Sequence, residues 1–337
     1  MSFGKNKKNC GHRISARFFS ALTAIALVAL MSSSCTKTDD GLSDVFTGTQ
    51  GLKISVSGFS REILISSFNP ESISIPFIAT LENKGRHTIG SNDFKLVLSG
   101  HDPKLIDCYG ESGSGFVIRN CEAALAYGEK FEGKSTLRRI GDKKILTNDM
   151  FEFVTKREGI SGEIYPFTVL FSLCYRYRTY FSDSLMLDPS STPQRVDFHN
   201  QASTRTHSGG QGAPLGVTRV SSLTLGNKAI VFITVKKLDN VQVYYDEANN
   251  PSAQKCGSAS YNIRNKFKVT KAELSDFREM SLCTGKTFYL NQNGEGEFTC
   301  EFEIRGDIRN EISAILNLEL EYDVFDYSQQ SFVIRKI

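Results

Sequence analysis

Cysteine is the residue type in this sequence whose chemistry is easiest to interpret. The 337-residue chain has eight cysteines. Cys10 and Cys35 lie near the N-terminus, and the other six lie in the body: Cys108, Cys121, Cys174, Cys256, Cys283 and Cys300. The Cys-x-x-Cys spacing of zinc ribbons and thioredoxin-type sites is absent from the sequence. In an exported protein, six cysteines favour disulfides over metal sites.

Spacing favours three disulfides, although the sequence alone leaves other pairings open. The favoured pairs are Cys108 with Cys121, Cys283 with Cys300, and Cys174 with Cys256. Each of the first two pairs flanks a glycine-bearing turn and would close a short loop, which stabilises a fold by roughly 3 kcal/mol. The third would be a long-range link. The alternative is that one or more pairs stay reduced and buried.

The N-terminus has the pattern of a secretory signal. Residues 1–17 contain five basic residues and no acid, and an apolar run over residues 18–31 is followed by three serines and Cys35. A basic start, a short apolar middle and small residues at the end are typical of an export signal, here residues 1–34. The run is shorter than a comfortable membrane-spanning helix, although an uncleaved anchor is the alternative.

Cys35 suggests how the exported protein is held. A cysteine directly after an apolar run and small residues resembles the lipobox of prokaryotic lipoproteins, in which that cysteine carries the lipid. Ser32 stands where such boxes usually have leucine. Lipidation of Cys35 is therefore expected, with simple cleavage or a retained anchor as alternatives. Residues 35–50 are small and polar and predict a flexible tether between the membrane and the folded body.

Removing the signal changes the formal charge. The full chain carries 40 basic and 37 acidic residues, a net charge of +3. The five basic residues of the signal leave 40 − 5 = 35 against 37, which is −2. Without a basic surplus or a basic cluster, nucleic acid is not expected as a partner.

The other residues with possible chemistry carry no motif. None of the histidines has the spacing of a catalytic triad or of His-Glu-x-x-His, and His101 is interpreted as part of a turn. Two rows of carboxylates are interpreted as solvated strand faces, with calcium binding as the alternative. The rows are Glu319, Glu321 and Asp323, and Glu297, Glu301 and Glu303. The sequence therefore predicts no catalytic, cofactor or metal site, and a protein that is not an enzyme.

Alternating apolar and polar residues predict antiparallel strands that are buried on one face. The clearest runs are 73–81, 298–304 and 316–324, and turn residues such as Asn83-Lys84-Gly85 separate such runs. The best candidate for a helix is the short segment 148–156. Many short strands with frequent turns indicate an all-β chain of Ig-like sandwiches.

The strands fall into two sets, which predict two tandem sandwiches at 51–189 and 213–337. Residues 190–212 between them are rich in Ser, Thr and Gly and indicate a linker or a long connecting strand. The halves resemble each other weakly, for example in IPFIATLENKG and IVFITVKKLDN, and each ends on a long aromatic strand. A degenerate duplication is the favoured interpretation, and two unrelated sandwiches the alternative.

Tyr175 and Tyr177 share one face of a strand-like run. Such a pair could form a platform for a carbohydrate or a peptide. More often, inward tyrosines near the end of a sandwich strand pack in the core and bond a backbone group through the hydroxyl. The packing role is the favoured prediction.

Residues 174–189 and 206–220 carry a longer pattern, in which a Cys-Tyr-x-Tyr-x-Thr strand and an Asp-Pro turn precede Gly-Gly-Gln-Gly-Ala-Pro. The matching residues are Cys174, Tyr175, Tyr177, Thr179, Asp188, Pro189, Gly209, Gly210, Gln211, Gly212, Ala213 and Pro214. This pattern resembles uncharacterised secreted or membrane-anchored archaeal surface proteins with tandem Ig-like, adhesion-module-like sandwiches. It departs at Met186, where that family tends to have a second cysteine. The resemblance implies a fold and a compartment, and no activity.

These observations favour an exported, non-enzymatic protein on the extracytoplasmic side of the membrane. We expect a role in adhesion, envelope assembly or partner binding, with the membrane contacted through the N-terminal lipid or signal anchor. A protein partner at the cell surface would contact sheet edges and end loops. The alternative is an extracytoplasmic module that binds a ligand or a glycan, which would require an aromatic cleft near Tyr175 and Tyr177 or near the linker.

Overall fold

The computed structural model describes most of the body of the chain: residues 48–65, 74–102, 106–110, 113, 115–119, 121–147, 151–155, 164–187, 204–207, 210–225, 228–246, 263–275, 277–279, 283–304 and 312–337. Regular structure there is β-strand apart from the 3₁₀ turn η1 (Ser91–Asp93) and a single 3₁₀ residue at Ile263. The all-β class predicted from the alternation is confirmed. None of the described helical residues forms a span long and apolar enough to cross a membrane.

Several predictions concern residues outside this part of the chain. They are the signal at 1–34, the lipidation site Cys35, the tether as far as residue 47, Cys256, and residues 190–203 of the predicted linker. All of these stay predictions.

One large sheet runs through the described body, and its strands are antiparallel except where β2 joins β22 in parallel. Its main path is β20 (Thr287–Tyr289), β18 (Lys266–Leu274), β22 (Ile312–Lys336), β13 (Ile164–Leu187), β6 (Phe94–Ser99), β9 (Glu122–Leu125) and β8 (Phe116–Arg119). Off this path, β22 also pairs with β17 (Gln242–Tyr244) and β2 (Glu62–Ile65).

Four smaller sheets make up the rest of the strands in the described residues. They contain β1 (Leu52–Ser57), β4 (Ile78–Asn83) and β11 (Lys143–Thr147); β10 (Lys130–Phe131) and β5 (Ile89–Gly90); β3 (Ser74–Ile75), β12 (Phe151–Thr155) and β7 (Ile106–Gly110); and β14 (Arg205–Thr206), β15 (Leu215–Leu225), β16 (Lys228–Lys237), β21 (Glu295–Ile304) and β19 (Phe277–Glu279). β1 contacts β22 and β15 contacts β13, so two of these sheets pack against the long central pair.

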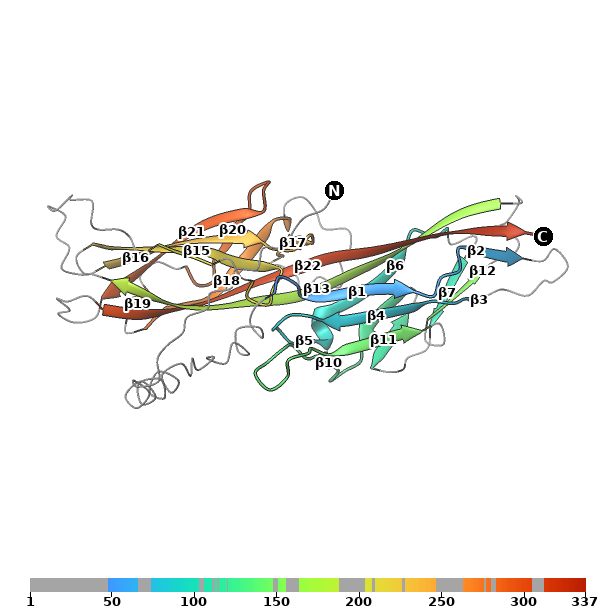
Figure 1. The fold of residues 1–337 in the computed structure, drawn as a ribbon, viewed down its shortest axis with the longest axis horizontal. Coiled ribbons are helices and arrows are strands. Elements are labelled where there is room, and N and C mark those ends of the chain that lie inside the picture. Colours follow the sequence, from blue (N-terminus) through green and yellow to red (C-terminus); the bar gives the residue numbers. More distant parts are fainter. Residues whose placement is uncertain are drawn as a thin grey trace, which may run out of the picture. The chain divides into compact units, whose positions relative to one another are not determined.

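The longest strands, β13 and β22, lie side by side and pair along the whole of β13 (Figure 1). The antiparallel ladder runs from Ile164 opposite Arg335 to Leu187 opposite Ile312 with no shift of register. β13 ends the first predicted sandwich and β22 ends the second. Strands assigned to different predicted sandwiches therefore belong to one sheet.

The strand order is nearly symmetric about this ladder. β6 pairs with the N-terminal half of β13, and β18 pairs with the N-terminal half of β22. The sets β1-β4-β11 and β15-β16-β21 are each centred on one of the two apolar strands that resemble each other in sequence. This arrangement supports the duplication hypothesis.

The predicted domain bounds, 51–189 and 213–337, stay a prediction. The structure does show how strands of the two predicted domains pair. Residues Ser43–Ile337 form one compact unit. Within it, the C-terminal half of β13 pairs with the N-terminal half of β22, and the C-terminal half of β22 pairs back with the start of β13. Each half of the sequence thus extends its last strand beside strands of the other half.

The buried faces follow the predicted alternation. On β22 the even-numbered residues from 314 to 324 are buried, and on β21 Phe298, Cys300 and Phe302 are buried. The run predicted at 73–81 is interrupted, since β3 ends at Ile75 and β4 begins at Ile78. Pro76 lies in this gap and has no backbone N–H to donate to a ladder.

The helix predicted at 148–156 is wrong. Residues Phe151–Thr155 form β12, which lies between β3 and β7 in a three-stranded sheet. The segment contains two phenylalanines, a valine and a threonine, residues that fit a pleated surface well. Tertiary pairing on both sides therefore outweighs its weak helical pattern.

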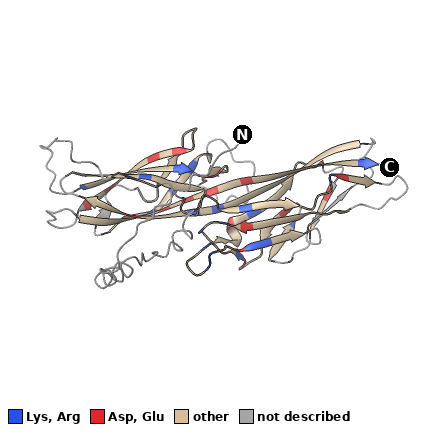
Figure 2. Cartoon of the chain, viewed as in Figure 1, with Lys and Arg blue, Asp and Glu red and all other residues tan. Residues whose placement is uncertain are grey.

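The acids on β22 are not a solvated face, contrary to the sequence interpretation. Asp323 is fully buried and Glu321 is 7% exposed. Directly opposite on β13, Arg176 Nε lies 3.0 Å from Asp323 Oδ1 and Arg178 Nη2 lies 2.6 Å from Glu321 Oε2. Figure 2 marks the basic positions of the chain in blue and the acidic positions in red. The pKa of Asp323 is raised to about 6, because burial disfavours the carboxylate more than Arg176 favours it. The acids of β21 do reach solvent, with Glu297 exposed.

The ladder predicts that neither half of the sequence folds alone. A fragment of residues 51–189 would leave β13 without its partner strand, and its unpaired backbone groups would be open to aggregation. We expect this fragment to lack a cooperative urea transition by circular dichroism, whereas residues 43–337 unfold in one. A soluble 51–189 fragment with its own sharp transition would contradict this prediction.

Candidate functional site

Tyr175 and Tyr177 are both fully buried, so the packing role predicted for them is confirmed and the platform role is not. The Tyr177 hydroxyl donates to the Gly212 carbonyl at 2.8 Å and accepts from the His87 N–H at 3.1 Å. A Cβ atom at Gly85 would overlap this hydroxyl, so the loop that holds His87 needs glycine there. Tyr177 thereby joins β13 to two loops from distant parts of the sequence.

The end of the predicted linker is a fixed part of this arrangement. Gly212 has φ +67°, a left-handed conformation that suits glycine, and its N–H donates to the Gly48 carbonyl at 2.9 Å. Its carbonyl accepts from the Arg86 N–H at 3.0 Å as well as from Tyr177. Of the residues that carry the predicted resemblance to archaeal surface proteins, Asp188, Pro189 and Gly209 lie outside the described residues.

The turn after β4 is held by one buried side chain, Asn83. Its amide nitrogen donates to the carbonyls of His87 at 2.7 Å and Phe131 at 3.1 Å, and its amide oxygen accepts from the Gly85 N–H at 3.1 Å. These three hydrogen bonds to backbone groups hold the turn in one conformation. The turn places the side chains of Arg86 and His87 beside β13.

These elements enclose an open pocket with a volume of about 460 Å³, which we call the Arg86 pocket. One wall is the turn after β4, a second is the loop after β10, and the third is Tyr180 of β13. The lining residues are Arg86, His87, Thr88, Lys134, Ser135, Thr136 and Tyr180. The two loops are tied together, since the Lys134 N–H donates to the Gly85 carbonyl at 2.7 Å.

The side chains of the Arg86 pocket are arranged by contacts with one another. The Arg86 guanidinium lies 5.3 Å from the centre of the Tyr180 ring, a cation–π distance. The Tyr180 hydroxyl lies 3.2 Å from His87 Nδ1. Burial, helped by the Arg178 charge, lowers the pKa of His87 to about 4, and burial raises the pKa of Tyr180. At neutral pH both are uncharged, and Arg86 and Lys134 bring positive charge to the pocket.

This combination suits the binding of an anionic group. A guanidinium offers a planar fork of donors that matches a carboxylate or a sulfate, and its stacking on Tyr180 limits its rotamers in advance. Ser135 and Thr136 add hydroxyls that can donate or accept, and the Thr88 hydroxyl can accept a further hydrogen bond. The Thr88 hydroxyl donates to Glu132 Oε2 at 3.2 Å, so an acid lies just behind one wall.

Sequence reasoning did not find this pocket. It identified the Asn83-Lys84-Gly85 turn and the tyrosine strand, but it drew no inference from Arg86, Lys134 or Tyr180. Tyr180 lies on the same strand as Tyr175 and Tyr177, yet with the opposite side-chain direction. The available signal was a basic residue directly after each of two glycine turns, at Gly85 and Gly133.

Two of the predicted disulfides are confirmed. Cys108 is bonded to Cys121 and Cys283 to Cys300, with Cα–Cα distances of 5.2 and 5.4 Å. Cys174 is fully buried and disulfide-bonded as well. Its predicted partner, Cys256, lies outside the described residues, so that pairing stays a prediction. Disulfides of this kind are typical of proteins outside the reducing cytoplasm.

Comparison with known proteins gives no family for the chain. No family model matches the sequence, and no curated protein matches it. A solved structure, "Enterococcal surface protein, partial N-terminal region", is similar with a TM-score of 0.22 and 8% identity over 81% of this chain and 84% of that chain. The resemblance to archaeal surface proteins stays a prediction, and the all-β fold is compatible with it.

The lowered pKa of His87 predicts a loss of stability in mild acid. The unfolded histidine binds a proton near pH 6.5 and the folded one only near pH 4, so the unfolded state gains protons first as the pH falls. Stability from this difference is complete above pH 6.5 and falls by about 3 kcal/mol by pH 4. His87→Gln should flatten the pH dependence of the free energy of unfolding, measured with urea, in this interval. Parallel curves for the variant and the parent would contradict the assignment.

Proposed function

We propose that this chain is an exported, non-enzymatic cell-surface protein that binds an acidic glycan in the Arg86 pocket. The observation that carries the proposal is the stacking of the Arg86 guanidinium on Tyr180 beside Lys134 and three hydroxyl side chains. Of the two roles that the sequence left open, this pocket favours ligand binding over contact through sheet edges alone.

An acidic sugar has the chemistry that this pocket would recognise. Its carboxylate or sulfate would accept hydrogen bonds from the guanidinium and the ammonium. Its hydroxyls would donate to Thr88 and exchange hydrogen bonds with Ser135 and Thr136. The pocket is open, so a residue within a long polysaccharide could enter with its neighbours left outside. Adhesion to such a polymer, or assembly of an envelope layer that contains one, is the role that follows.

The compartment is supported by the cysteines. The disulfides Cys108–Cys121 and Cys283–Cys300 fit an extracytoplasmic location. The N-terminal signal pattern and Cys35 supply a route of export and an anchor, and these remain part of the proposal. On a lipid-anchored protein outside the membrane, the pocket would be accessible to glycans of the cell surface and not to cytoplasmic molecules.

Titration calorimetry with matched sugars tests the binding. We expect oligogalacturonate or a sulfated oligosaccharide to bind, and methyl-esterified oligogalacturonate, which has the same ring without the charge, to bind at least tenfold more weakly. Arg86→Gln should lower the affinity for the acidic sugar at least tenfold, about 1.4 kcal/mol, because it removes the charged fork.

The control for this experiment is Arg61→Gln. Arg61 is exposed and precedes β2, which pairs with the far end of β22, so its loss changes the net charge equally without touching the Arg86 pocket. Unchanged affinity in Arg61→Gln with lowered affinity in Arg86→Gln supports the proposal. Equal losses in the two variants, or no binding of either acidic sugar, would overturn it.

The proposed anchor has its own test. Cells that express the full chain and are fed a labelled fatty acid should incorporate label into the protein, and Cys35→Ser should remove the label while leaving export of the body intact. Label that persists in Cys35→Ser would rule out Cys35 as the lipidated residue.

A further inference from the structure

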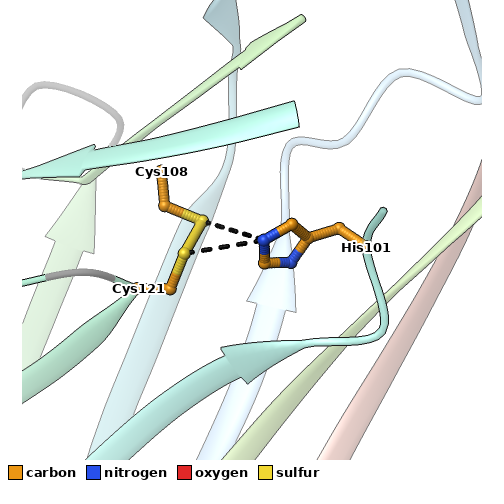
Figure 3. Close-up of a disulfide and its surroundings, with 3 residues drawn as sticks. All are labelled: His101, Cys108 and Cys121. Atoms are coloured by element: carbon orange, nitrogen blue, oxygen red, sulfur yellow. Dashed lines mark hydrogen bonds between the residues drawn. A yellow bond between two sulfur atoms is a disulfide. The ribbon is translucent and has the colours of Figure 1, made fainter. Parts of the chain in front are cut away.

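A histidine faces the Cys108–Cys121 disulfide at equal distance from both sulfurs (Figure 3). His101 Nε2 lies 3.6 Å from Cys108 Sγ and 3.6 Å from Cys121 Sγ. All three side chains are partly buried, and their ligand atoms lie within 4.8 Å of one another. The sequence interpretation of His101 as a turn residue did not anticipate this cluster.

Three separate elements bring the cluster together. Cys108 is on β7, Cys121 is in the turn between β8 and β9, and His101 follows β6. The Leu98 N–H of β6 donates to the Cys121 carbonyl at 2.8 Å, which fixes the turn beside the chain that leads to His101. Cys121 also has φ +63°, a left-handed conformation that costs a residue with a Cβ atom about 1 kcal/mol or more. Tertiary structure therefore holds Cys121 in place against a local preference.

The histidine is already at the distance that a tetrahedral metal site requires. Metal–sulfur bonds of about 2.3 Å and metal–nitrogen bonds of about 2.0 Å place nitrogen and sulfur ligands roughly 3.5 Å apart, and two sulfurs roughly 3.8 Å apart. The observed nitrogen-to-sulfur distances are 3.6 Å. Only the two sulfurs, which are bonded to each other, would have to separate.

We propose that the reduced form of Cys108 and Cys121, together with His101, binds a divalent metal ion of the zinc type. A dithiol reductant transfers two electrons and two protons to the disulfide, which breaks the S–S bond and gives two thiols, while the reductant is oxidised to its own disulfide. The ion then displaces one proton from each thiol and binds the neutral imidazole through Nε2. Three protein ligands leave a fourth position for water. The S–S bond and the metal are mutually exclusive, so this corner of the fold has two states.

The other short disulfide provides an internal comparison. Within the described residues, the group of His101, Cys108 and Cys121 is the one cluster with metal-ligand spacing, and Cys283–Cys300 has no such histidine. The proposed site lies outside the Arg86 pocket and does not depend on the sugar-binding proposal.

Cobalt(II) is the probe for the experiment, because thiolate ligation in tetrahedral geometry gives strong visible and near-ultraviolet absorption. The full exported chain is reduced with a phosphine, freed of reductant under argon and titrated with cobalt(II). We expect one equivalent of saturable tetrahedral spectrum that zinc displaces, and none in the oxidised chain. Cys283→Ser/Cys300→Ser should keep the spectrum, and Cys108→Ser/Cys121→Ser should lose it.

His101→Ala distinguishes the proposed three-ligand site from two thiols alone. This variant retains both cysteines, and circular dichroism of its oxidised form checks that it folds. After reduction it should bind cobalt(II) at least tenfold more weakly, with a shifted visible band, because a nitrogen ligand is replaced by water. Absence of a tetrahedral spectrum in the reduced parent would overturn the proposal. So would a spectrum that persists in Cys108→Ser/Cys121→Ser or an affinity unchanged in His101→Ala.

Discussion

The pairing of β13 with β22 is the constraint on which the rest of the structure depends. Over the 24 residues of β13, each strand supplies the backbone partners that the other requires. Buried N–H and C=O groups without partners cost several kcal/mol each, so neither strand is stable in this position alone. Because the two strands come from opposite halves of the sequence, the halves are bound into one folding unit by hydrogen bonds rather than by a surface contact between finished domains.

The two faces of the ladder fix its register in different ways. On one face, Tyr177 bonds Gly212 and His87, and Thr179 bonds the Leu215 carbonyl at 2.5 Å. On the other, the carboxylates of Asp323 and Glu321 are buried and pair with Arg176, which is mostly buried, and with Arg178, which is partly exposed. A slip of one residue would turn the tyrosines outward and leave Asp323 opposite a tyrosine instead of Arg176. Such pairs add little net stability, but breaking one leaves an uncompensated charge, so they oppose every other register.

How much the sequence could predict follows from how local each feature is. Alternation along one strand predicted the strands and their buried faces, and two disulfides followed from cysteines that flank nearby turns. Pairing between β13 and β22 was out of reach, because a strand pattern does not reveal its partner. The same limit explains why the acids of β22 were wrongly interpreted as a solvated face. Asp323 is typical of a solvated face until Arg176 is known to lie opposite. The Arg86 pocket depends on residues brought together from positions 86, 134 and 180.

The ladder also connects the Arg86 pocket to the second half of the sequence. The turn that holds Arg86 is bonded to the Gly212 carbonyl, and Gly212 precedes Ala213 and Leu215, which are buried in the core beside β13. One wall of the pocket is therefore supported by a segment that is in place only when β15 has packed on β13. A ligand that binds this pocket binds the folded unit and not either half, so occupancy stabilises the whole ladder by mass action. In the proposed function, recognition of the ligand and resistance to unfolding would then depend on the same contacts.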